Sequence, residues 1–544
     1  MRHSVLTVLA VLPVFAVCDN VSAGDHLREL QQRAVETRGS DWGYWGADPG
    51  TYSTWTNHSN RLIPVYSFGI DLQSVSGENS VYRNPDALAK LYGKVPEETA
   101  DPDAAHLDQT DIYRLQKQAI AGGAKRVILF VFDGMDWPTT HAAATCKVQK
   151  VAYESGRGTG LHFQDYQGVA TDFGWFVSSA WAAGAKADVN NQTVDGLRKP
   201  FGGYSTRIGG ATPWAKPLDP QYPIGKSSPI AHCVTDSASS ATSMTAGIKT
   251  FNGSVNIDVE GRRVSPIAHQ LQNDGWPIGV VTSVPISHAT PAAAYAHNVT
   301  RGDYQDLSRD LVGLKTDHRD EALPGVDVLL GAGWGIDKSS DGGQGSNFVP
   351  GNRYLPKADR EAIDHRNGGR YEVVERSFGA NGGDSLRAAA KRAIDGQHRL
   401  FGFFGAVGGH LPFRTADGNY NTADSIKTGN SSKNDPAENY SAADVAENPT
   451  LAEMTTVALD VLASRSDRWW LMVEAGDVDW ANHSNNIDNS IGAVLSGDAA
   501  FRAATEWVEA NGGWKDTVIL LTADHGHYLN LKKPEVLVGK RSIW

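Results

Sequence analysis

The stretch Arg126-Val127-Ile128-Leu129-Phe130-Val131-Phe132, followed at once by Asp133-Gly134, decides how the chain is expected to fold. An apolar run of this length without polar alternation is typical of a strand that is buried on both faces of a parallel sheet. A carboxylate just past such a strand is well placed to hold a metal ion, although Asp-Gly is also a common turn.

Similar apolar runs recur along the chain and are bounded by turn residues: Ile278–Val284, Val326–Leu330, Leu400–Phe404, Trp470–Glu474 and Thr517–Thr522. Helical patterns lie between them, for example Ser385–Ile394 and Pro449–Ser464. This alternation predicts an α/β fold, namely a doubly wound three-layer α/β/α sandwich with a large, mostly parallel central sheet. In such sheets ligands bind beyond the carboxyl ends of the strands.

Two stretches do not show this alternation of strands and helices. Val151–Ser228 is rich in glycine and aromatic residues, and Arg414–Asn448 is rich in Asn, Asp and Ser. We expect both to be surface insertions that could rim a site, and the alternative is that they are plain variable loops.

The composition excludes some functions. The chain has 544 residues and a formal charge of −12, from 50 basic and 62 acidic residues. A protein that binds the phosphate backbone needs a basic surface, so we expect no nucleic-acid partner. A small acidic ligand would need a local positive site, such as a metal cluster or a helix N-terminus.

The N-terminus is typical of a secretory signal peptide over residues 1–23. A basic start precedes an apolar stretch from Val5 to Val17, and Val21-Ser22-Ala23 is similar to a cleavage site. The alternative is a membrane anchor, but about 13 apolar residues are too few where about 20 are needed. We therefore expect a periplasmic or secreted protein with no membrane contact after cleavage. Cys146 and Cys233 then remain, and the sequence leaves their pairing open.

A possible nucleophile lies in Thr235-Asp236-Ser237-Ala238-Ser239-Ser240-Ala241-Thr242. Because Ser239–Lys249 can be helical, Ser237 would lie at the first turn, where backbone N–H groups and the helix dipole stabilise an anion. The alternative is that Asp236 or Ser237 only caps the helix.

Further polar residues follow the other apolar runs. Thr290, in Ser287-His288-Ala289-Thr290-Pro291, offers a hydroxyl oxygen to a hard cation, and Arg301 offers a planar fork for two phosphate oxygens. Glu474 ends a strand, where a lone carboxylate is costly. Two later pairs of residues have side chains and spacings that suit the binding of a metal ion. Asp479 and His483 stand at i and i+4, and Asp524 and His525 stand on a turn.

Together these motifs resemble those of alkaline phosphatases. The matching residues are Asp133-Gly134-Met135, Thr235-Asp236-Ser237-Ala238, Thr290-Pro291-Ala292 with Arg301, Glu474 with Asp479 and His483, and Thr522-Ala523-Asp524-His525. The resemblance implies a single catalytic domain over residues 24–544 that hydrolyses small phosphate monoesters, and it hints at a homodimer.

One family feature is expected at a different place in this chain. The family has a further zinc histidine after the Thr-Ala-Asp-His turn, but the chain stops at Trp544. The segment Asn57–Gly69, which contains His58, resembles that missing zinc-histidine strand, and Leu107–Tyr113 resembles the start of the last helix of the family. We therefore expect a circular permutation in which residues 24–120 correspond to the usual C-terminal segment. The alternative is a truncated enzyme with an unrelated N-terminal extension.

The resemblance also implies the roles of the site residues. Two Zn²⁺ ions and one Mg²⁺ ion are expected, held respectively by Asp479, His483 and His58; by Asp133, Asp524 and His525; and by Asp133, Thr290 and Glu474. Ser237 would attack phosphorus to give a phosphoserine, while Arg301 holds two oxygens. Asp236 is expected to position Arg301.

The sequence also leaves some secondary residues and alternative functions to consider. His288 and Trp480 stand where family members vary, and His527 is expected to lie behind the metal ligands rather than among them. A phosphodiesterase of the same superfamily is the nearest alternative function, and a non-catalytic, metal-stabilised binding protein is another. A sulfatase is disfavoured because no cysteine opens a C-x-P-x-R run.

Overall fold

Ten strands form one large sheet at the centre of the molecule. The computed structural model describes residues 26–55, 57–195, 200–230, 232–406, 408–422 and 438–539. In spatial order the strands are β12 (Tyr371–Glu375), β13 (Arg399–Phe403), β9 (Val328–Ala332), β8 (Ile278–Pro285), β16 (Trp469–Ala475), β4 (Arg126–Phe132), β17 (Thr517–Thr522), β2 (Ile63–Phe68), β5 (Thr171–Val177) and β3 (Leu107–Asp108).

The sheet is mostly parallel, as predicted. Every neighbouring pair from β12 to β17 runs parallel. Only β2 runs against its neighbours, β17 and β5, and β3 is again parallel to β5. All six predicted strands form. β4 and β17 have the predicted bounds, whereas β9 begins two residues later than predicted, at Val328.

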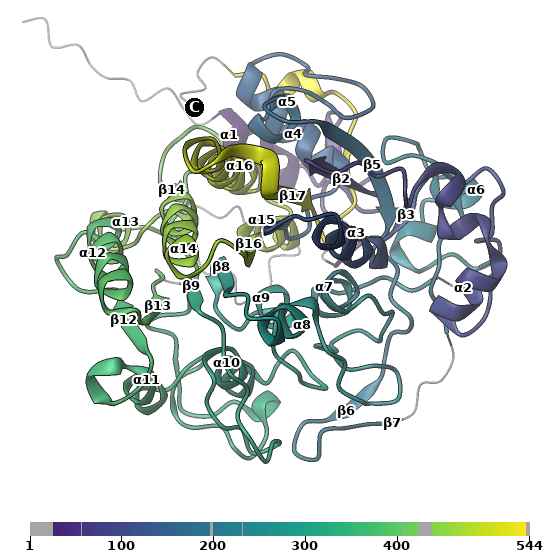
Figure 1. Ribbon diagram of the computed structural model, residues 1–544. Helices are drawn as coiled ribbons and strands as arrows, with labels where there is room; N and C mark the ends of the chain where they lie inside the picture. The colour runs from purple at the N-terminus through teal and green to yellow at the C-terminus, as the bar shows by residue number, and fades with distance from the viewer. Residues whose placement is uncertain are drawn as a thin grey trace, which may run out of the picture.

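Helices cover both faces of this sheet, which confirms the three-layer arrangement (Figure 1). One layer consists of α4 (Trp137–Val148), α12 (Gly382–Gly396), α14 (Leu451–Arg465) and α16 (Ile487–Ala510). The other consists of α3 (Thr110–Ala121), α7 (Ser237–Ala246), α8 (Ile267–Asn273), α9 (Ala289–Ala293) and α10 (Tyr304–Val312).

Smaller elements surround these layers. The remaining helices are α1 (His26–Glu36), α2 (Pro85–Tyr92), α5 (His162–Asp165), α6 (Thr206–Gly209), α11 (Lys357–Ile363), α13 (Ala442–Ala446) and α15 (Asp477–His483). Four two-stranded sheets pair β1 (Gly43–Trp45) with β18 (Leu529–Leu531), β6 (Lys186–Asp188) with β7 (Thr193–Asp195), β10 (Asp337–Lys338) with β11 (Gly351–Asn352), and β14 (Asn421–Thr422) with β15 (Glu438–Asn439).

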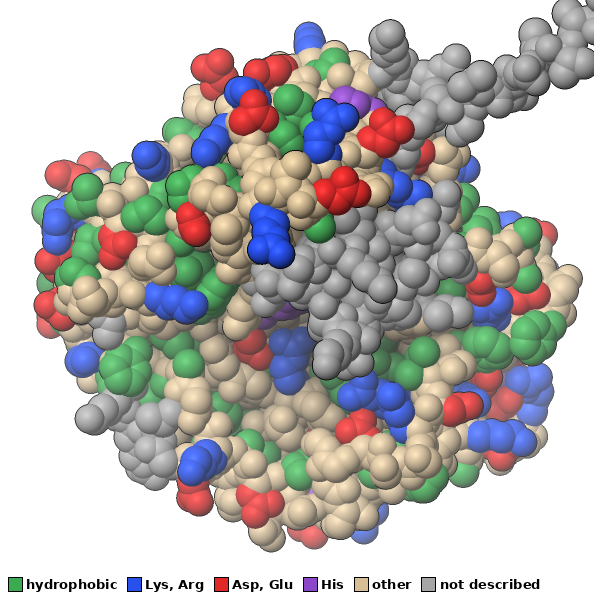
Figure 2. Space-filling model, turned by 180° about the vertical axis from the view of Figure 1, so that it is seen from behind, with side chains coloured by type: hydrophobic (Ala, Val, Ile, Leu, Met, Phe, Trp, Pro, Cys, Tyr) green, Lys and Arg blue, Asp and Glu red, His purple; other side chains and the backbone are tan. Residues whose placement is uncertain are grey.

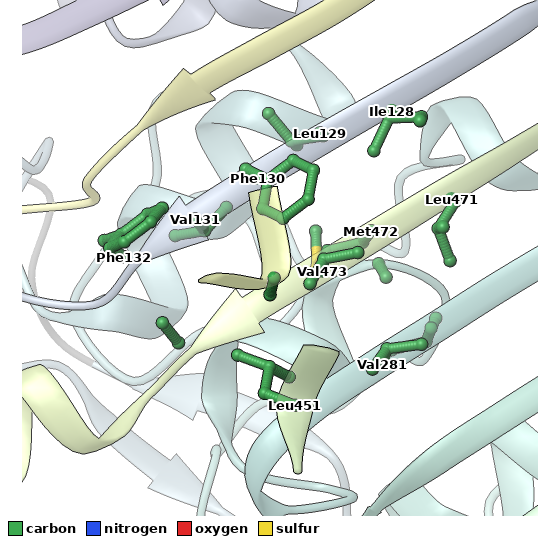
Figure 3. Packing of buried hydrophobic residues seen from close by; sticks show 14 of the residues in the cluster. Ile128, Leu129, Phe130, Val131, Phe132, Val281, Leu451, Leu471, Met472 and Val473 are labelled. Carbon is green, nitrogen blue, oxygen red and sulfur yellow. The ribbon is translucent and has the colours of Figure 1, made fainter. Parts of the chain in front are cut away.

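The central strands are apolar throughout because helices cover them from both sides. Side chains of Ile128–Phe132 in β4 pack beside Leu471–Val473 in β16, with Leu451 of α14 nearby (Figure 3). Helix α16 approaches the strands closely at Gly497, where an added Cβ would come within 2.3 Å of Phe132 Cε1. This packing holds the strand ends, and therefore the residues that follow them, in fixed positions.

The reading of Val151–Ser228 as a surface insertion is wrong for one part of it. Thr171–Val177 is strand β5, which pairs with β2 in the central sheet. Its first residues are only partly buried, so its aromatic residues lie in a mixed pattern unlike that of the fully buried strands. The rest of this stretch holds α5, α6 and the β6–β7 hairpin. Of Arg414–Asn448, residues 423–437 lie outside the described part of the chain.

The structure tests only some of the remaining sequence predictions. The predicted signal peptide, residues 1–23, lies outside the described residues. Within the described part, no helix combines the length and apolar character needed to cross a bilayer.

Cys146 and Cys233 are both buried and are not joined to each other. On the face seen from behind, acidic and basic side chains are interspersed rather than separated (Figure 2).

Candidate active site

The polar motifs meet at one edge of the sheet because they follow neighbouring parallel strands. Asp133 comes directly after β4, and Asp524 and His525 follow β17, which pairs with β4 in parallel. Glu474 lies in β16 opposite Val131 of β4. The carboxyl ends of these strands therefore bring together side chains that are hundreds of residues apart in sequence.

One group of metal-ligand side chains consists of Asp133, Asp524 and His525, whose donor atoms all lie within 4.8 Å of one another. The Nε2 atom of His525 is 3.2 Å from Asp133 Oδ1 and 3.3 Å from Asp524 Oδ2. Asp524 Oδ1 accepts hydrogen bonds from the backbone N–H groups of Gly134 and His525, at 2.9 and 3.0 Å. Asp524 Oδ2 and Asp133 Oδ2 are buried without a partner of good hydrogen-bond geometry among the described residues. Such oxygens are available to a cation.

Ser237 points into this group from the N-terminus of α7. Its Oγ atom is 3.2 Å from His525 Nε2 and 3.4 Å from Asp133 Oδ1. The preceding residue, Asp236, caps the helix by accepting a hydrogen bond from the N–H of Ser239 at 3.0 Å. Asp236 therefore caps the helix, and Ser237 occupies the first turn, where the sequence interpretation placed the possible nucleophile.

Arg301 stands beside the same helix. Its Nη1 atom donates to Asp236 Oδ2 at 3.2 Å, and its Nη2 atom is 3.5 Å from His288 Nε2. Burial alone would raise the pKa of Asp236, but the charge of Arg301 lowers it below the usual value. Asp236 is therefore held as a carboxylate that fixes one side of the guanidinium, and a planar fork is left to face an anion.

The second group of metal-ligand side chains combines His58, from the N-terminal segment, with residues near the C-terminal end of the chain. His58, Asp479, His525 and His527 place one ligand atom each within 4.8 Å of the others. Asp479 and His483 lie at i and i+4 on α15, as predicted, with His483 Nε2 3.4 Å from Asp479 Oδ1. His58 Nε2 is 3.5 Å from the same oxygen.

Contacts of the Nδ1 atom and of the ring face fix the orientation of His58. Its Nδ1 atom is 2.9 Å from the backbone carbonyl of Thr235, and its ring stacks on that of His525 at 3.5 Å between centroids. An N–H that donates to the carbonyl leaves the Nε2 lone pair facing Asp479. His527 Nε2 lies 2.6 Å from Asp479 Oδ1, so this histidine joins the group through that carboxylate.

A third group lies around Glu474. Asp133, His288 and Glu474 offer ligand atoms within 4.8 Å of one another. Glu474 Oε2 accepts a hydrogen bond from the Thr282 hydroxyl, whereas Glu474 Oε1 and Thr290 Oγ1 are buried without a partner of good hydrogen-bond geometry in the described chain. These oxygens suit a hard cation.

Burial shifts the titration of these carboxyl groups. It raises the pKa of Glu474 to about 8, and it raises the pKa of Asp524 to about 7, with the charge of Asp133 adding to the effect. The pKa of Asp133 is raised well above its usual value by burial and then by the charges of Asp479 and Glu474. Three acids that resist ionisation side by side need either protons or a cation, so the site is electrostatically suited to metal ions.

The structure also adds residues that the sequence did not single out. His410 Nδ1 lies 2.6 Å from Asp477 Oδ1, and its ring is 5.4 Å from that of Trp480. Trp480 also contacts His288 edge to face, at 5.8 Å between ring centroids. His410 lies well beyond the end of β13 at Phe403, so the strand-end pattern that drew attention to the other motifs did not single it out. Thr282 lies inside β8, where a polar residue gave no signal either.

Comparisons with known proteins identify the family of the chain. The model of the alkaline phosphatase family matches residues 218–542, which is more than half of the chain. Alkaline phosphatase H of Pseudomonas aeruginosa is 28% identical over 337 residues, covering 59% of this chain and 64% of that protein. Alkaline phosphatase 4 of Bacillus subtilis is 27% identical over 311 residues, covering 57% of this chain and 50% of that protein.

The chain thus spans between half and two thirds of the length of these two relatives. Among solved structures, the alkaline phosphatase of Thermus thermophilus aligns with 74% of this chain and 60% of its own, at 20% identity and a TM-score of 0.42.

Proposed function

Because the chain belongs to the alkaline phosphatase family, we propose that it hydrolyses phosphate monoesters with Ser237 as the nucleophile. The observation that carries the proposal is the position of Ser237 Oγ, 3.2 Å from His525 Nε2 and 3.4 Å from Asp133 Oδ1. A buried hydroxyl between metal-ligand side chains, at a helix N-terminus, has the surroundings that an activated serine needs.

Three metal ions are part of the proposal. Zn²⁺ would be held by His58, Asp479 and His483 at one position and by Asp133, Asp524 and His525 at another, and Mg²⁺ by Asp133, Thr290 and Glu474. The donor types fit, since nitrogen and carboxylate ligands suit zinc and oxygen ligands alone suit magnesium. The unpartnered buried oxygens at the second and third positions, from Asp133, Asp524, Thr290 and Glu474, support the assignment there. When bound, the ions would lower the pKa of the serine hydroxyl and offset charge on the attacking and leaving oxygens.

The residues of the chain would then act in sequence. Ser237 Oγ loses its proton to water and attacks phosphorus, so that the P–Oγ bond forms and the bond from phosphorus to the leaving oxygen breaks. The leaving oxygen takes up a proton from water. Arg301 holds two non-bridging oxygens through its fork, while Asp236 keeps the guanidinium in place. Backbone N–H groups at the start of α7 face the same charge. Water attacks the phosphoserine, and phosphate and Ser237 are released.

Arg301 favours monoesters over diesters. The guanidinium fork binds two unesterified phosphate oxygens. A diester has only two such oxygens, so both must fit the fork in one fixed orientation. The phosphodiesterase alternative predicts the opposite preference. Initial rates on a monoester and a diester of the same alcohol therefore separate the two functions.

The test of the nucleophile is Ser237→Ala, measured with metal content. We expect phosphate release from a monoester to fall by at least about 10³-fold while the bound zinc stays unchanged, because the hydroxyl is removed and the proposed ligands remain. Turnover that survives the substitution would contradict the assignment of Ser237. A metal-replete wild type that releases no phosphate from several esters would instead favour the non-catalytic binding protein.

The circular permutation is a second part of the proposal. In its support, β2 follows His58 and inserts between β17 and β5, and helix α3 leads through Gly122-Gly123 into β4. The two ends of the described chain also touch, with His26 Nε2 2.8 Å from the Val536 carbonyl and β1 paired with β18. Chain ends in contact are what a permuted connection requires. The truncated enzyme with an N-terminal extension predicts that residues before β4 are dispensable for metal binding.

Export, a periplasmic or secreted location and a homodimer remain predictions. They rest on the N-terminal residues 1–23 and on the family resemblance. N-terminal sequencing of the exported protein and its mass in solution would test them.

A further inference from the structure

A hollow of about 460 Å³ lies directly beside the candidate active site. His58 and Asp236 belong to both. The other walls come from separate segments: Trp55 from the N-terminal part, Phe201 and Ile224 from the stretch between β5 and α7, and His232 just before Asp236. Because none of these four has a role in the proposed chemistry, the hollow is an additional feature.

The hollow lies on the side where a leaving group is expected. The nucleophile Ser237 stands against Asp133 and His525, whereas His58 Nε2 faces Asp479 and His483. In an in-line displacement the leaving oxygen departs on the side opposite the attacking oxygen. The alcohol part of the ester would therefore emerge beside His58, at the mouth of this hollow.

Apolar surfaces line much of the hollow. The indole N–H of Trp55 donates to the His58 carbonyl at 2.9 Å, which fixes the ring next to the proposed zinc ligand. The Lys226 ammonium lies 4.9 Å from the centroid of that ring. Phe201 keeps 38% of its surface exposed, and Ile224 is buried in the wall. Exposed aromatic side chains beside a polar site are typical of ligand pockets.

His232 adds a polar group to the wall. It is 7% exposed and stacks on Tyr222 with ring centroids 4.5 Å apart. Neither ring nitrogen has a partner of good hydrogen-bond geometry in the described chain, and the nearby Gly203 carbonyl could satisfy only one of them. Burial lowers the pKa of His232 to about 3, so the ring is neutral and keeps one donor and one acceptor. A buried nitrogen without a partner is costly unless a ligand completes it.

Building on the phosphatase activity proposed above, we propose that this hollow binds the leaving group and selects aryl phosphates whose ring carries a hydrogen-bonding substituent. The ring packs against Trp55 and Phe201, and the substituent meets His232. Because kcat/KM compares two esters at the transition state, the preference is measured as a ratio of kcat/KM rather than in binding alone.

The experiment compares kcat/KM for phenyl phosphate with kcat/KM for glycerol 2-phosphate. The intrinsic reactivities of the two esters are the same for every variant, so a change in their ratio reports on the hollow. Phe201→Ala is expected to lower the ratio about tenfold, because the aryl group loses an apolar contact that glycerol does not use. The matched control is Phe378→Ala, since Phe378 is 80% exposed and packs on Trp334 away from the hollow.

His232→Phe tests the polar part of the proposal. It keeps a ring stacked on Tyr222, so it is expected to preserve the rate on phenyl phosphate and to lower the preference for 4-hydroxyphenyl phosphate several-fold. Unchanged ratios in Phe201→Ala, or an equal loss on both esters, would overturn the aryl pocket while the phosphatase stands. No phosphate from any of these esters with the wild type would overturn the proposed function, and the pocket with it.

Discussion

The Nε2 atoms of His58 and His483 lie 3.2 Å apart, although 425 residues separate the two histidines in the chain. Both atoms also face Asp479 Oδ1, at 3.5 and 3.4 Å. Two imidazoles and one carboxylate that converge on a point are a typical ligand set for zinc. The N-terminal segment therefore contributes directly to the site rather than merely covering it.

The first prediction concerns His58→Ala. We expect the variant to bind about one zinc ion per chain fewer than the wild type and to lose activity by at least about 100-fold, because one position is left with two protein ligands. Metal content by mass spectrometry and phosphate release check the two effects together. His398→Ala is the control, since His398 stacks on His365 outside the candidate site. Unchanged zinc and activity would make His58 a bystander.

The second prediction concerns the Arg301 fork. Arg301→Lys keeps a positive charge but loses the two parallel donors, so kcat/KM on a monoester is expected to fall about 100-fold. Asp236→Asn, which removes the carboxylate charge that holds the guanidinium, is expected to lose about tenfold, mainly in KM. Arg207→Lys is the control because Arg207 pairs with Glu98 at the exposed surface. Equal effects of all three substitutions would contradict a specific role for the fork.

The third prediction concerns the metal-free protein. Burial raises the pKa of Glu474 from 4.5 to about 8 and that of Asp524 from 3.8 to about 7. In the folded state these groups keep protons that the unfolded chain gives up, so their stabilising contribution is complete at low pH and is lost as the pH rises toward 8. We expect the Tm of chelated protein to fall by roughly 5 °C across this range.

Metal ions should remove this fall, because a cation stabilises the ionised carboxylates. Thermal unfolding with chelator and with added Zn²⁺ and Mg²⁺, between pH 4.5 and 8, measures the difference. In Glu474→Gln the chelated protein should show a smaller fall, since the amide does not titrate. A fall that is the same in the variant would assign the effect to other groups.

The sequence predicted the part of the site that depends on strand ends. Asp133, Glu474, Asp524 and His525 each stand at or just past a buried apolar run. Parallel strands have their carboxyl ends at a common edge, so local patterns were enough to place these residues together. The helix that carries Ser237 could be predicted in the same way from its capping residue.

Other features depended on contacts that no local pattern reveals. Strand β5 lies within a glycine- and aromatic-rich stretch, and only its pairing with β2 makes it part of the sheet. Thr282 supports Glu474 from within the next strand, where a threonine fits a buried strand as well as a valine does. His410 reaches Asp477 from a loop whose path is set by tertiary packing.

The last prediction tests the permutation by rearranging the chain. In the variant, residues 24–121 are moved behind Trp544 through a short flexible linker, and the chain starts at Gly122. Ala121, the last residue of α3, and the following turn residues Gly122 and Gly123 are exposed, so a break there disturbs little packing. His26 and Val536 are already in contact, so the linker need bridge only a short distance.

We expect the rearranged protein to bind as much zinc as the original and to keep its phosphatase rate within about threefold, because every contact of His58 is retained. Deletion of residues 24–121 is the matched variant and should lose both the strand β2 and about one zinc ion. A rearranged protein that folds, as judged by cooperative unfolding, but binds less zinc would show that the original order of the segments is needed. A deletion variant with full zinc content would favour the truncated enzyme with a dispensable extension.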